Sequence, residues 1–215
     1  MNHTYSHLIW DFNGTLLNDV DACIQSANAL LSAHGLPTLK SHDQYRSVFG
    51  FPVVDYYQRL GFDFSRVPFS VLAVEWVDHY NHYSRNAVLY EGVPLVLAQV
   101  YKAQIPQYVL SATEASMLHR QVSALGISQY FEELLGMDDI HAHGKTERGL
   151  AWRHGHPDAK PLLIGDTDHD AAVAKAMGID FALFAGGHQS KKQLLACEPI
   201  RILDKLDEVL ELLQI

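Results

Sequence analysis

The chain has 215 residues, of which 48% are hydrophobic and 19% are charged, values that are ordinary for a globular protein of one domain or two small ones. The formal net charge is −9 and no Lys/Arg-rich run occurs, so we expect neither a nucleic-acid partner nor an anionic membrane. The first residues lack the basic and apolar regions of a signal peptide, and the two cysteines make no disulfide framework. We therefore expect a cytoplasmic protein.

The stretch 6–17, SHLIWDFNGTLL, begins with a short apolar run that is typical of a buried strand. The run stops at Asp11, after which Gly14 lets the backbone turn and Thr15 offers a hydroxyl beside the carboxylate. In an open α/β sheet, ligands bind beyond the carboxyl ends of the strands. Asp11 is therefore a candidate nucleophile or metal ligand, although an acid that caps a simple turn has the same pattern.

The residues that follow predict helices with no strand between them. Apolar residues recur three and four apart in the first of these segments, which gives it one apolar face. The predicted helices cover 18–34, 41–49, 53–60 and 68–83. We interpret residues 17–86 as a small all-helical cap domain inserted after the first strand, and residues 1–16 and 87–215 as the catalytic core.

From about residue 90 the pattern changes, and predicted strands alternate with predicted helices. The strands are expected at 107–110, 131–135, 161–164 and 179–184, and the helices at 92–102, 113–126, 144–154, 168–177 and 204–213. This alternation is typical of βαβ units. The sequence thus predicts an α/β fold with a doubly wound parallel sheet, a Rossmann-like core, and a helical cap.

Three predicted strands end in polar groups, at Asp11, Ser111 and Asp166, and in one parallel sheet these groups would meet at one edge. If a helix starts near residue 168, Asp170 lies in its first turn and faces the same crevice. Asp11, Asp166 and Asp170 then supply oxygen ligands that suit Mg²⁺ with a substrate phosphate. Lys145 stands near a helix start, where a cation could meet that phosphate. Taken singly, each residue could also be a cap, a turn acid or a surface lysine.

These motifs, in this order, resemble those of the haloacid dehalogenase superfamily, and within it the phosphoglycolate phosphatase-like hydrolases with a helical cap. The stretch 11–16, DFNGTL, resembles the first motif, DxDGT, and Ser111 after an apolar strand is similar to the second. Lys145 resembles the lone lysine of the third motif, and 165–170, GDTDHD, resembles the fourth, GDxxxD. The resemblance covers nearly the whole chain.

The resemblance implies a Mg²⁺-dependent phosphatase that acts on a small phosphorylated metabolite. Asp11 would attack phosphorus and form an aspartyl-phosphate, which water then hydrolyses. Lys145 and the metal would stabilise the charge of the transition state. The implied catalytic residues are Asp11, Asn13 and Lys145; the metal ligands are Asp11, Asn13 through its backbone carbonyl, Asp166 and Asp170; and the phosphate-binding residues are Thr15, Ser111, Ala112 and Lys145.

The chain departs from the family pattern at Asn13, where these phosphatases usually carry a second Asp. That Asp protonates the leaving alcohol and later activates water, and general acid–base catalysis contributes typically ~10²–10⁴-fold. An amide does neither, so we expect weak turnover of alkyl phosphates and a smaller loss on aryl or acyl phosphates. Replacing Asn13 by Asp should raise activity on an alkyl ester, unless His169 or a cap residue serves as the acid.

Other functions stay open on the same fold, because a fold does not determine a reaction. One is a phosphotransferase, and another is a catalytically weak phosphate-ligand binder or regulatory protein, which only Asn13 favours. A cap arginine that faces the site would indicate a carboxylate or second phosphate on the substrate, and Arg46, Arg59 and Arg85 are the candidates. We interpret the pairs His141-x-His143 and His154-x-His156 as surface residues. The protein is expected to be a monomer or a homodimer.

Overall fold

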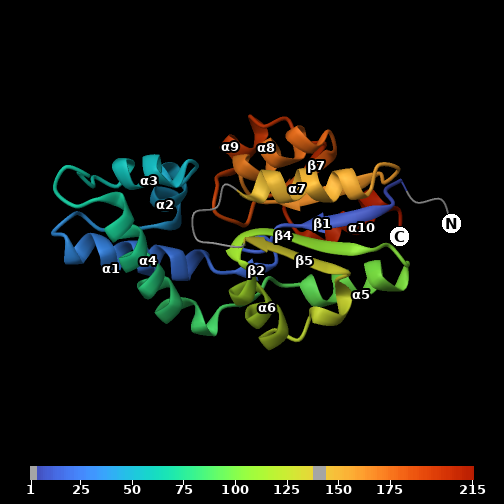
Figure 1. Ribbon diagram of the computed structural model, residues 1–215, viewed down its shortest axis with the longest axis horizontal. Helices are drawn as coiled ribbons and strands as arrows, with labels where there is room; N and C mark the ends of the chain where they lie inside the picture. The colour runs from blue at the N-terminus through green and yellow to red at the C-terminus, as the bar shows by residue number, and fades with distance from the viewer. Residues whose placement is uncertain (1–3, 138–143) are drawn as a thin grey trace.

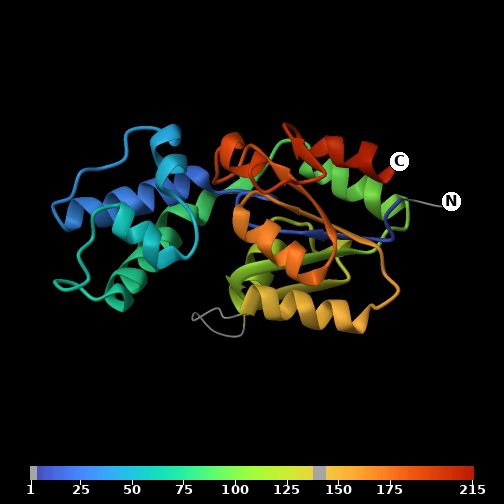
Figure 2. The same cartoon turned by 90° about the horizontal axis from the view of Figure 1, so that it is seen from above.

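The computed structural model of the protein describes residues 4–137 and 144–215, so the pair His141 and His143 lies outside the described residues. A core built on one sheet with helices on both faces carries a block of helices at one end (Figures 1 and 2). The prediction of an α/β fold with a doubly wound parallel sheet and a helical cap is confirmed.

The sheet has six strands in the order β5-β4-β1-β6-β7-β8, and every neighbouring pair is parallel. The strands are β1 (His7–Trp10), β4 (Gln107–Glu114), β5 (Glu133–Met137), β6 (Pro161–Gly165), β7 (Asp180–Phe184) and β8 (Arg201–Leu203). In the centre, Ile9 of β1 is in register with Tyr108 on one side and Leu163 on the other. The strand order reverses at β1, and ligands bind at such a switch point.

Helices cover both faces of this sheet (Figure 1). One face packs against α5 (Val93–Lys102), α6 (Ala115–Ala124) and α10 (Val209–Leu213), and the other against α7 (Gly144–Gly155), α8 (Asp168–Met177) and α9 (Lys191–Leu195). Leu8 and Trp10 are buried in the first of these two cores and Ile9 in the second. Since β1 is buried on both faces, its apolar residues form a continuous run instead of an alternation.

The cap consists of α1 (Val20–Ala33), α2 (His42–Val48), α3 (Val53–Arg59) and α4 (Phe69–Tyr83). It has a hydrophobic core of its own, in which Leu30, Tyr45 and Leu72 are at most 1% exposed. A short antiparallel ladder of β2 (Leu17–Asn18) and β3 (Val88–Leu89) joins the two chain segments that connect the cap to the core. The domain boundaries at 17 and 86 stay a prediction, and this ladder lies beside them.

The structure differs from the predicted elements mainly at β4. The strand was expected to end at residue 110 with a helix from 113, but it continues to Glu114, which caps α6 by accepting hydrogen bonds from the backbone N–H groups of Ser116 and Met117, both at 2.9 Å. The β4–β5 register shifts between Leu110 and Glu114, which indicates a bulge. The predicted final helix is divided into a 3₁₀ turn, Leu206–Glu208, and α10. Further 3₁₀ turns cover Ser84–Asn86 and Ser128–Tyr130.

Two further observations concern the predicted class of protein. Over 4–137 and 144–215, no helix has both the length and the apolar character that crossing a membrane requires. Cys23 is buried and Cys197 is half-buried, and both are free thiols.

Gly136 of β5 is a position where the fold admits no side chain. A Cβ there would lie 2.7 Å from the Cα of Ala115 and 3.0 Å from the carbonyl oxygen of Thr113, both of which are backbone atoms that cannot rotate away. We predict that Gly136→Ala lowers the free energy of unfolding by about 1–3 kcal/mol, measured by urea denaturation. Gly155→Ala is the control, because nothing lies within 4 Å of its added Cβ. Equal stability of the two variants would contradict the prediction.

Candidate active site

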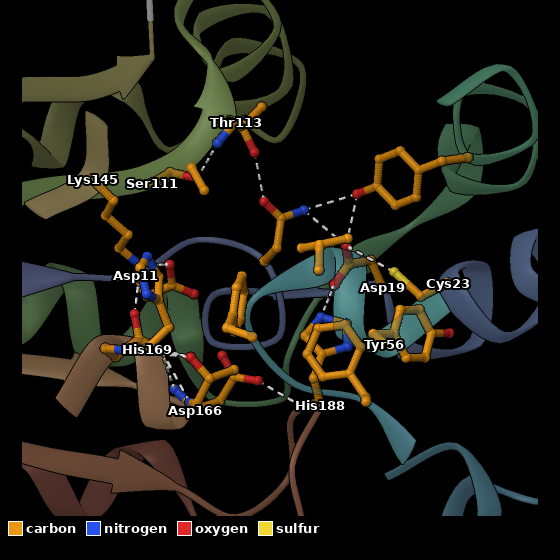
Figure 3. Close-up of a pocket in the computed structure, with 18 of the residues that line it drawn as sticks. Asp11, Asp19, Cys23, Tyr56, Ser111, Thr113, Lys145, Asp166, His169 and His188 are labelled. Atoms are coloured by element: carbon orange, nitrogen blue, oxygen red, sulfur yellow. Dashed lines mark hydrogen bonds and ion pairs between the residues drawn. The ribbon is translucent and has the colours of Figure 1, made fainter. Parts of the chain in front are cut away.

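The carboxyl ends of β1 and β6 and the first turn of α8 bring acidic side chains from distant parts of the sequence together (Figure 3). Asp11, Asp166 and Asp170, which we call the acidic cluster, each have a carboxylate oxygen within 4.8 Å of the others. All three side chains are buried, with Asp11 the most exposed at 7%. The three carboxylates among the predicted metal ligands therefore lie in one place, and a metal role for the Asn13 carbonyl stays a prediction.

Local structure explains why Asp11 and Asp170 point at the same space. The turn after β1 needs Gly14, because its φ is +74° and a Cβ there would collide with the side chains of Asp166 and His188. Asp170 is fixed by a capping box at the start of α8: the Thr167 hydroxyl accepts from the Asp170 N–H at 3.3 Å, and the Asp170 carboxylate accepts from the Thr167 N–H at 3.0 Å. This box turns the Asp170 carboxylate back toward the strand ends.

Lys145, in the first turn of α7, is the cation of the cluster. Its Nζ donates hydrogen bonds to Asp11 and to Asp170, and its side chain is buried. Burial alone would lower the pKa of Lys145, but the charges of Asp11 and Asp170 raise it above its ordinary value. Burial raises the pKa of Asp11 well above its ordinary range, and Lys145 offsets only part of this increase. One lysine is thus the cationic partner of two acidic side chains that repel each other.

Asp166 is held by the protein from two sides. Its carboxylate accepts a hydrogen bond from the Thr15 hydroxyl at 3.1 Å and another from the His188 backbone N–H at 2.6 Å. Burial raises the pKa of Asp166 to about 6. Thr15 is fully buried and its hydroxyl donates to Asp166, while its residue is not among those that line the cavity, so its role in phosphate binding stays a prediction.

The acidic cluster fits a hard divalent cation. Three buried carboxylates face one lysine, so negative charge is in excess, and carboxylate oxygens are the ligands that Mg²⁺ prefers. Burial is the main cause of the raised pKa values of Asp11 and Asp166, and the charges of Lys145 and His188 offset only part of it. The donor set therefore suits the metal that the sequence predicts.

Ser111 and Ala112 of β4 line the same cavity, and Figure 3 shows Ser111 beside Lys145. The Ser111 Oγ accepts a hydrogen bond from the Thr113 backbone N–H at 3.1 Å, which fixes the hydroxyl near the acidic cluster. Its hydroxyl proton is then available to an oxygen of a ligand. The predicted phosphate-binding groups, apart from Thr15, thus border the space that Asp11 faces.

Asn13 is fully engaged by hydrogen bonds. Its Nδ2 donates to Asp19 and to the Tyr80 hydroxyl, both at 2.8 Å, and its Oδ1 accepts from the Thr113 hydroxyl at 2.7 Å. The orientation of the amide follows from these partners, since a carboxylate only accepts and the Tyr80 hydroxyl already donates to Asp19 at 2.6 Å. Asn13 therefore connects the first turn of the core to α4 of the cap.

The sequence analysis missed Asp19 and His188 as parts of this site. His188 Nε2 lies 3.3 Å from Asp19, and its Nδ1 lies 2.9 Å from the Tyr45 hydroxyl of the cap. Burial would lower the pKa of His188, but the hydrogen bond to Asp19 and its charge raise it to about 9. The two form a buried ion pair. Asp19 follows β2 and had the pattern of a helix cap, so no local signal distinguished it.

The cavity between the cap and the core has a volume of about 340 Å³. Its floor contains the acidic cluster and Lys145, and its cap side contains apolar and aromatic side chains. His169, considered above as a replacement acid, lines the cavity and stacks on Phe51 with the ring centroids 4.6 Å apart. Burial lowers the pKa of His169, which favours its neutral form.

Known proteins share both the sequence pattern and the fold. The family of haloacid dehalogenase-like hydrolases matches residues 8–184. The chain is 25% identical to the phosphoglycolate phosphatase of Photobacterium profundum over 134 residues, which cover 61% of this chain and 58% of that protein. It is 23% identical to pyrophosphatase PpaX of Anoxybacillus flavithermus over 213 residues, which cover 96% and 95% of the two chains.

A structural comparison gives the same fold. The structure of protein tyrosine kinase A from Mycobacterium tuberculosis is similar, with a TM-score of 0.82 and 20% identity, and the match covers 98% of this chain and 99% of that one. Since the family match extends over most of the sequence, including Asp11 and the 165–170 motif, the chain belongs to the haloacid dehalogenase-like hydrolases.

Proposed function

We propose that this protein is a Mg²⁺-dependent phosphatase that hydrolyses a small phosphorylated molecule through a phosphoryl-Asp11 intermediate. The observation that carries the proposal is the meeting of three carboxylates and Lys145 at one edge of the sheet. The names of two relatives, a phosphoglycolate phosphatase and a pyrophosphatase, support a reaction at phosphorus. A cytoplasmic location and the state of monomer or homodimer stay predictions.

Asp11 is the nucleophile in this proposal. Its carboxylate oxygen forms a bond to phosphorus while the bond from phosphorus to the leaving oxygen breaks, and water later releases phosphate and restores the carboxylate. Lys145 holds the Asp11 carboxylate in place, and its charge reduces the repulsion between that carboxylate and the phosphate oxygens. The Ser111 hydroxyl and the Ala112 N–H would bind two of those oxygens.

The acidic cluster, with the backbone carbonyl of Asn13, would hold Mg²⁺. The bound ion supplies positive charge beside the transferring phosphoryl group. Thr15 and His188 keep the Asp166 carboxylate in position for this role. The cap closes the other side of the cavity and limits the access of water.

A phosphate-ligand binder with little turnover is the second candidate, and Asn13 is the observation that favours it. An amide cannot protonate a leaving alcohol, and both Nδ2 protons of Asn13 already have acceptors. The two candidates differ in whether a bound phosphate ester is cleaved, which a kinetic assay measures directly.

The first test is hydrolysis of 4-nitrophenyl phosphate during a Mg²⁺ titration. We expect turnover that rises with Mg²⁺ and disappears with a chelator. We also expect Asp11→Asn to lower kcat by about 10³-fold or more, because the amide cannot attack phosphorus. Turnover retained in Asp11→Asn would contradict the proposal, and tight binding of the ester without cleavage by the wild type would support the binder.

The second test concerns the metal alone. Mg²⁺ that binds only the folded protein stabilises it, by about 2.7 kcal/mol at roughly 100 times its Kd, so we expect Mg²⁺ to raise the Tm. Asp166→Asn should abolish this increase, because it removes one carboxylate from the cluster. Asp168→Asn is the matched control, because Asp168 is exposed and hydrogen bonds to Gln189. Equal Tm shifts in both variants would contradict the proposed ligand set.

The third test follows from the contact between Asn13 and Asp19. Asn13→Asp alone would set two buried carboxylates about as close as the present 2.8 Å contact, and one of them would have to take up a proton. The double variant Asn13→Asp/Asp19→Asn exchanges the two groups, which keeps one donor and one acceptor across the contact and leaves the net charge unchanged.

We predict that the double variant hydrolyses an alkyl phosphate faster than the wild type, toward the ~10²–10⁴-fold that general acid–base catalysis contributes. Both the double variant and Asp19→Asn lose the buried ion pair between Asp19 and His188, so Asp19→Asn alone is the control. A double variant that is no faster than the wild type would show that residue 13 does not limit the reaction.

A further inference from the structure

The cap side of the cavity is a wall of aromatic rings. Phe49, Phe51 and Tyr56 reach it from the α2–α3 region, and Trp76 and Tyr80 reach it from α4. The rings support one another, with centroid separations of 5.3 Å between Phe49 and Tyr56 and 5.1 Å between Trp76 and Tyr80. Figure 3 shows Tyr56 on the side of the cavity opposite Lys145 and Asp11. A substrate whose phosphate lies at Asp11 would place its remaining part against this aromatic wall.

The wall offers no cation to a second anionic group. Among the described residues, Lys145 is the one Lys or Arg that lines the cavity, and it is bound to the acidic cluster. Two candidate arginines of the cap point elsewhere: Arg46 donates to the carbonyl oxygens of Gly186 and Gly187, both at 2.9 Å, and Arg59 donates to that of Val48 at 2.6 Å. His188 is occupied by its ion pair with Asp19.

The acidic residues that line the cavity also disfavour a second anionic group on the substrate. They are Asp11, Asp19, Glu114, Asp166 and Asp170. A carboxylate or second phosphate on the substrate would leave water for an apolar wall beside these negative groups, without an ionic partner. An uncharged ring would instead gain from burial against other rings.

We propose that the substrate is an aryl phosphate, the phosphate monoester of an uncharged phenol, an inference that rests on the proposed phosphatase function. The aromatic wall would pack against the ring of this substrate. The amide of Asn13 donates no proton to a leaving oxygen, which favours a phenolic leaving group. A phenol has a pKa of about 10, far below that of an aliphatic alcohol, so phenolate leaves without a proton from residue 13. Asp11 forms its bond to phosphorus, the phenolate oxygen departs with the electron pair of the broken P–O bond, and it takes a proton from water.

The decisive comparison is kcat/KM for phenyl phosphate against 3-carboxyphenyl phosphate. The two esters share the ring and the phenolic leaving group, so the main difference between them is the added charge. We expect phenyl phosphate to be preferred by about 10²-fold, because the carboxylate finds no cationic partner at the wall. Equal values, or a preference for the carboxylated ester or for 2-phosphoglycolate, would overturn the inference while leaving the phosphatase proposal intact.

A matched pair of variants tests whether the wall itself selects the substrate. Val77 lines the cavity and Val74 does not, although both lie on α4 and both are exposed, at 41% and 55%. Val77→Arg should shift the ratio of the two kcat/KM values at least about 10-fold toward the carboxylated ester, since it supplies the missing cation. Val74→Arg should leave the ratio unchanged. A ratio unchanged in Val77→Arg, or shifted equally in both variants, would overturn the role of the wall.

Binding measurements separate this inference from the proposed function. Phenylphosphonate and 3-carboxyphenylphosphonate resist hydrolysis, and their Kd values can be measured by calorimetry in the presence of Mg²⁺. If no ester is cleaved but phenylphosphonate binds about 10-fold more tightly than 3-carboxyphenylphosphonate, the phosphatase proposal fails, and the inference that the ligand carries an uncharged ring is supported. If the carboxylated phosphonate binds as tightly or more tightly, the ligand class fails whatever the activity.

Discussion

The site depends on three buried carboxylates, two of which, Asp11 and Asp170, share one lysine. Two like charges repel by about 4 kcal/mol at a separation of roughly 4 Å and an effective dielectric constant of about 20, so the acidic cluster opposes its own assembly. The protein holds it together with hydrogen bonds from elsewhere: Thr15 and the His188 N–H to Asp166, and the capping box to Asp170. A sheet buried on both faces provides the stability that such a cluster requires.

A second group of charges lies where the cap meets the core, and it contacts this cluster through the His188 N–H that donates to Asp166. Asp19 and His188 neutralise each other, and the Tyr80 and Tyr45 hydroxyls bring α4 and α2 of the cap to the pair. Asn13 donates to Asp19 of this pair as a neutral amide. The cavity is consequently divided: excess negative charge lies on the floor, where a cation and a phosphate are needed, and the cap side is apolar.

The sequence predicted the parts of this arrangement that depend on local pattern. The apolar run ending at Asp11 identified β1, and a helix start near residue 168 placed Asp170 in the first turn of α8, where it faces Asp166. Strand ends in a parallel sheet meet at one edge, so the acidic cluster followed from topology. Short elements such as β8 and α9 were missed, because three to five residues carry too little periodicity.

Other features depend on tertiary contacts that no local pattern contains. Asp19 has the pattern of a helix cap, and only the packing of α4 against α1 brings Tyr80 to it. The aromatic residues of the cap occur on several helix faces, so the sequence did not indicate which of them face the cavity. The continuation of β4 to Glu114 was missed because Ser111 and Thr113 favour a turn or cap locally, whereas pairing with β5 keeps them extended.

The hydrogen bonds of Asn13 explain why an amide is compatible with this neighbourhood and a second carboxylate is not. A carboxylate at that position would face Asp19 at the 2.8 Å contact, and it would lose the donor that Asp19 and Tyr80 now share. The charges of Asp19 and His188 already neutralise each other, so another carboxylate here would have no cationic partner. The ion pair at the cap interface and an acid at residue 13 are therefore alternatives. In a site that contains the Asp19–His188 ion pair, residue 13 donates no proton to the leaving group. The leaving group therefore has to depart without that proton.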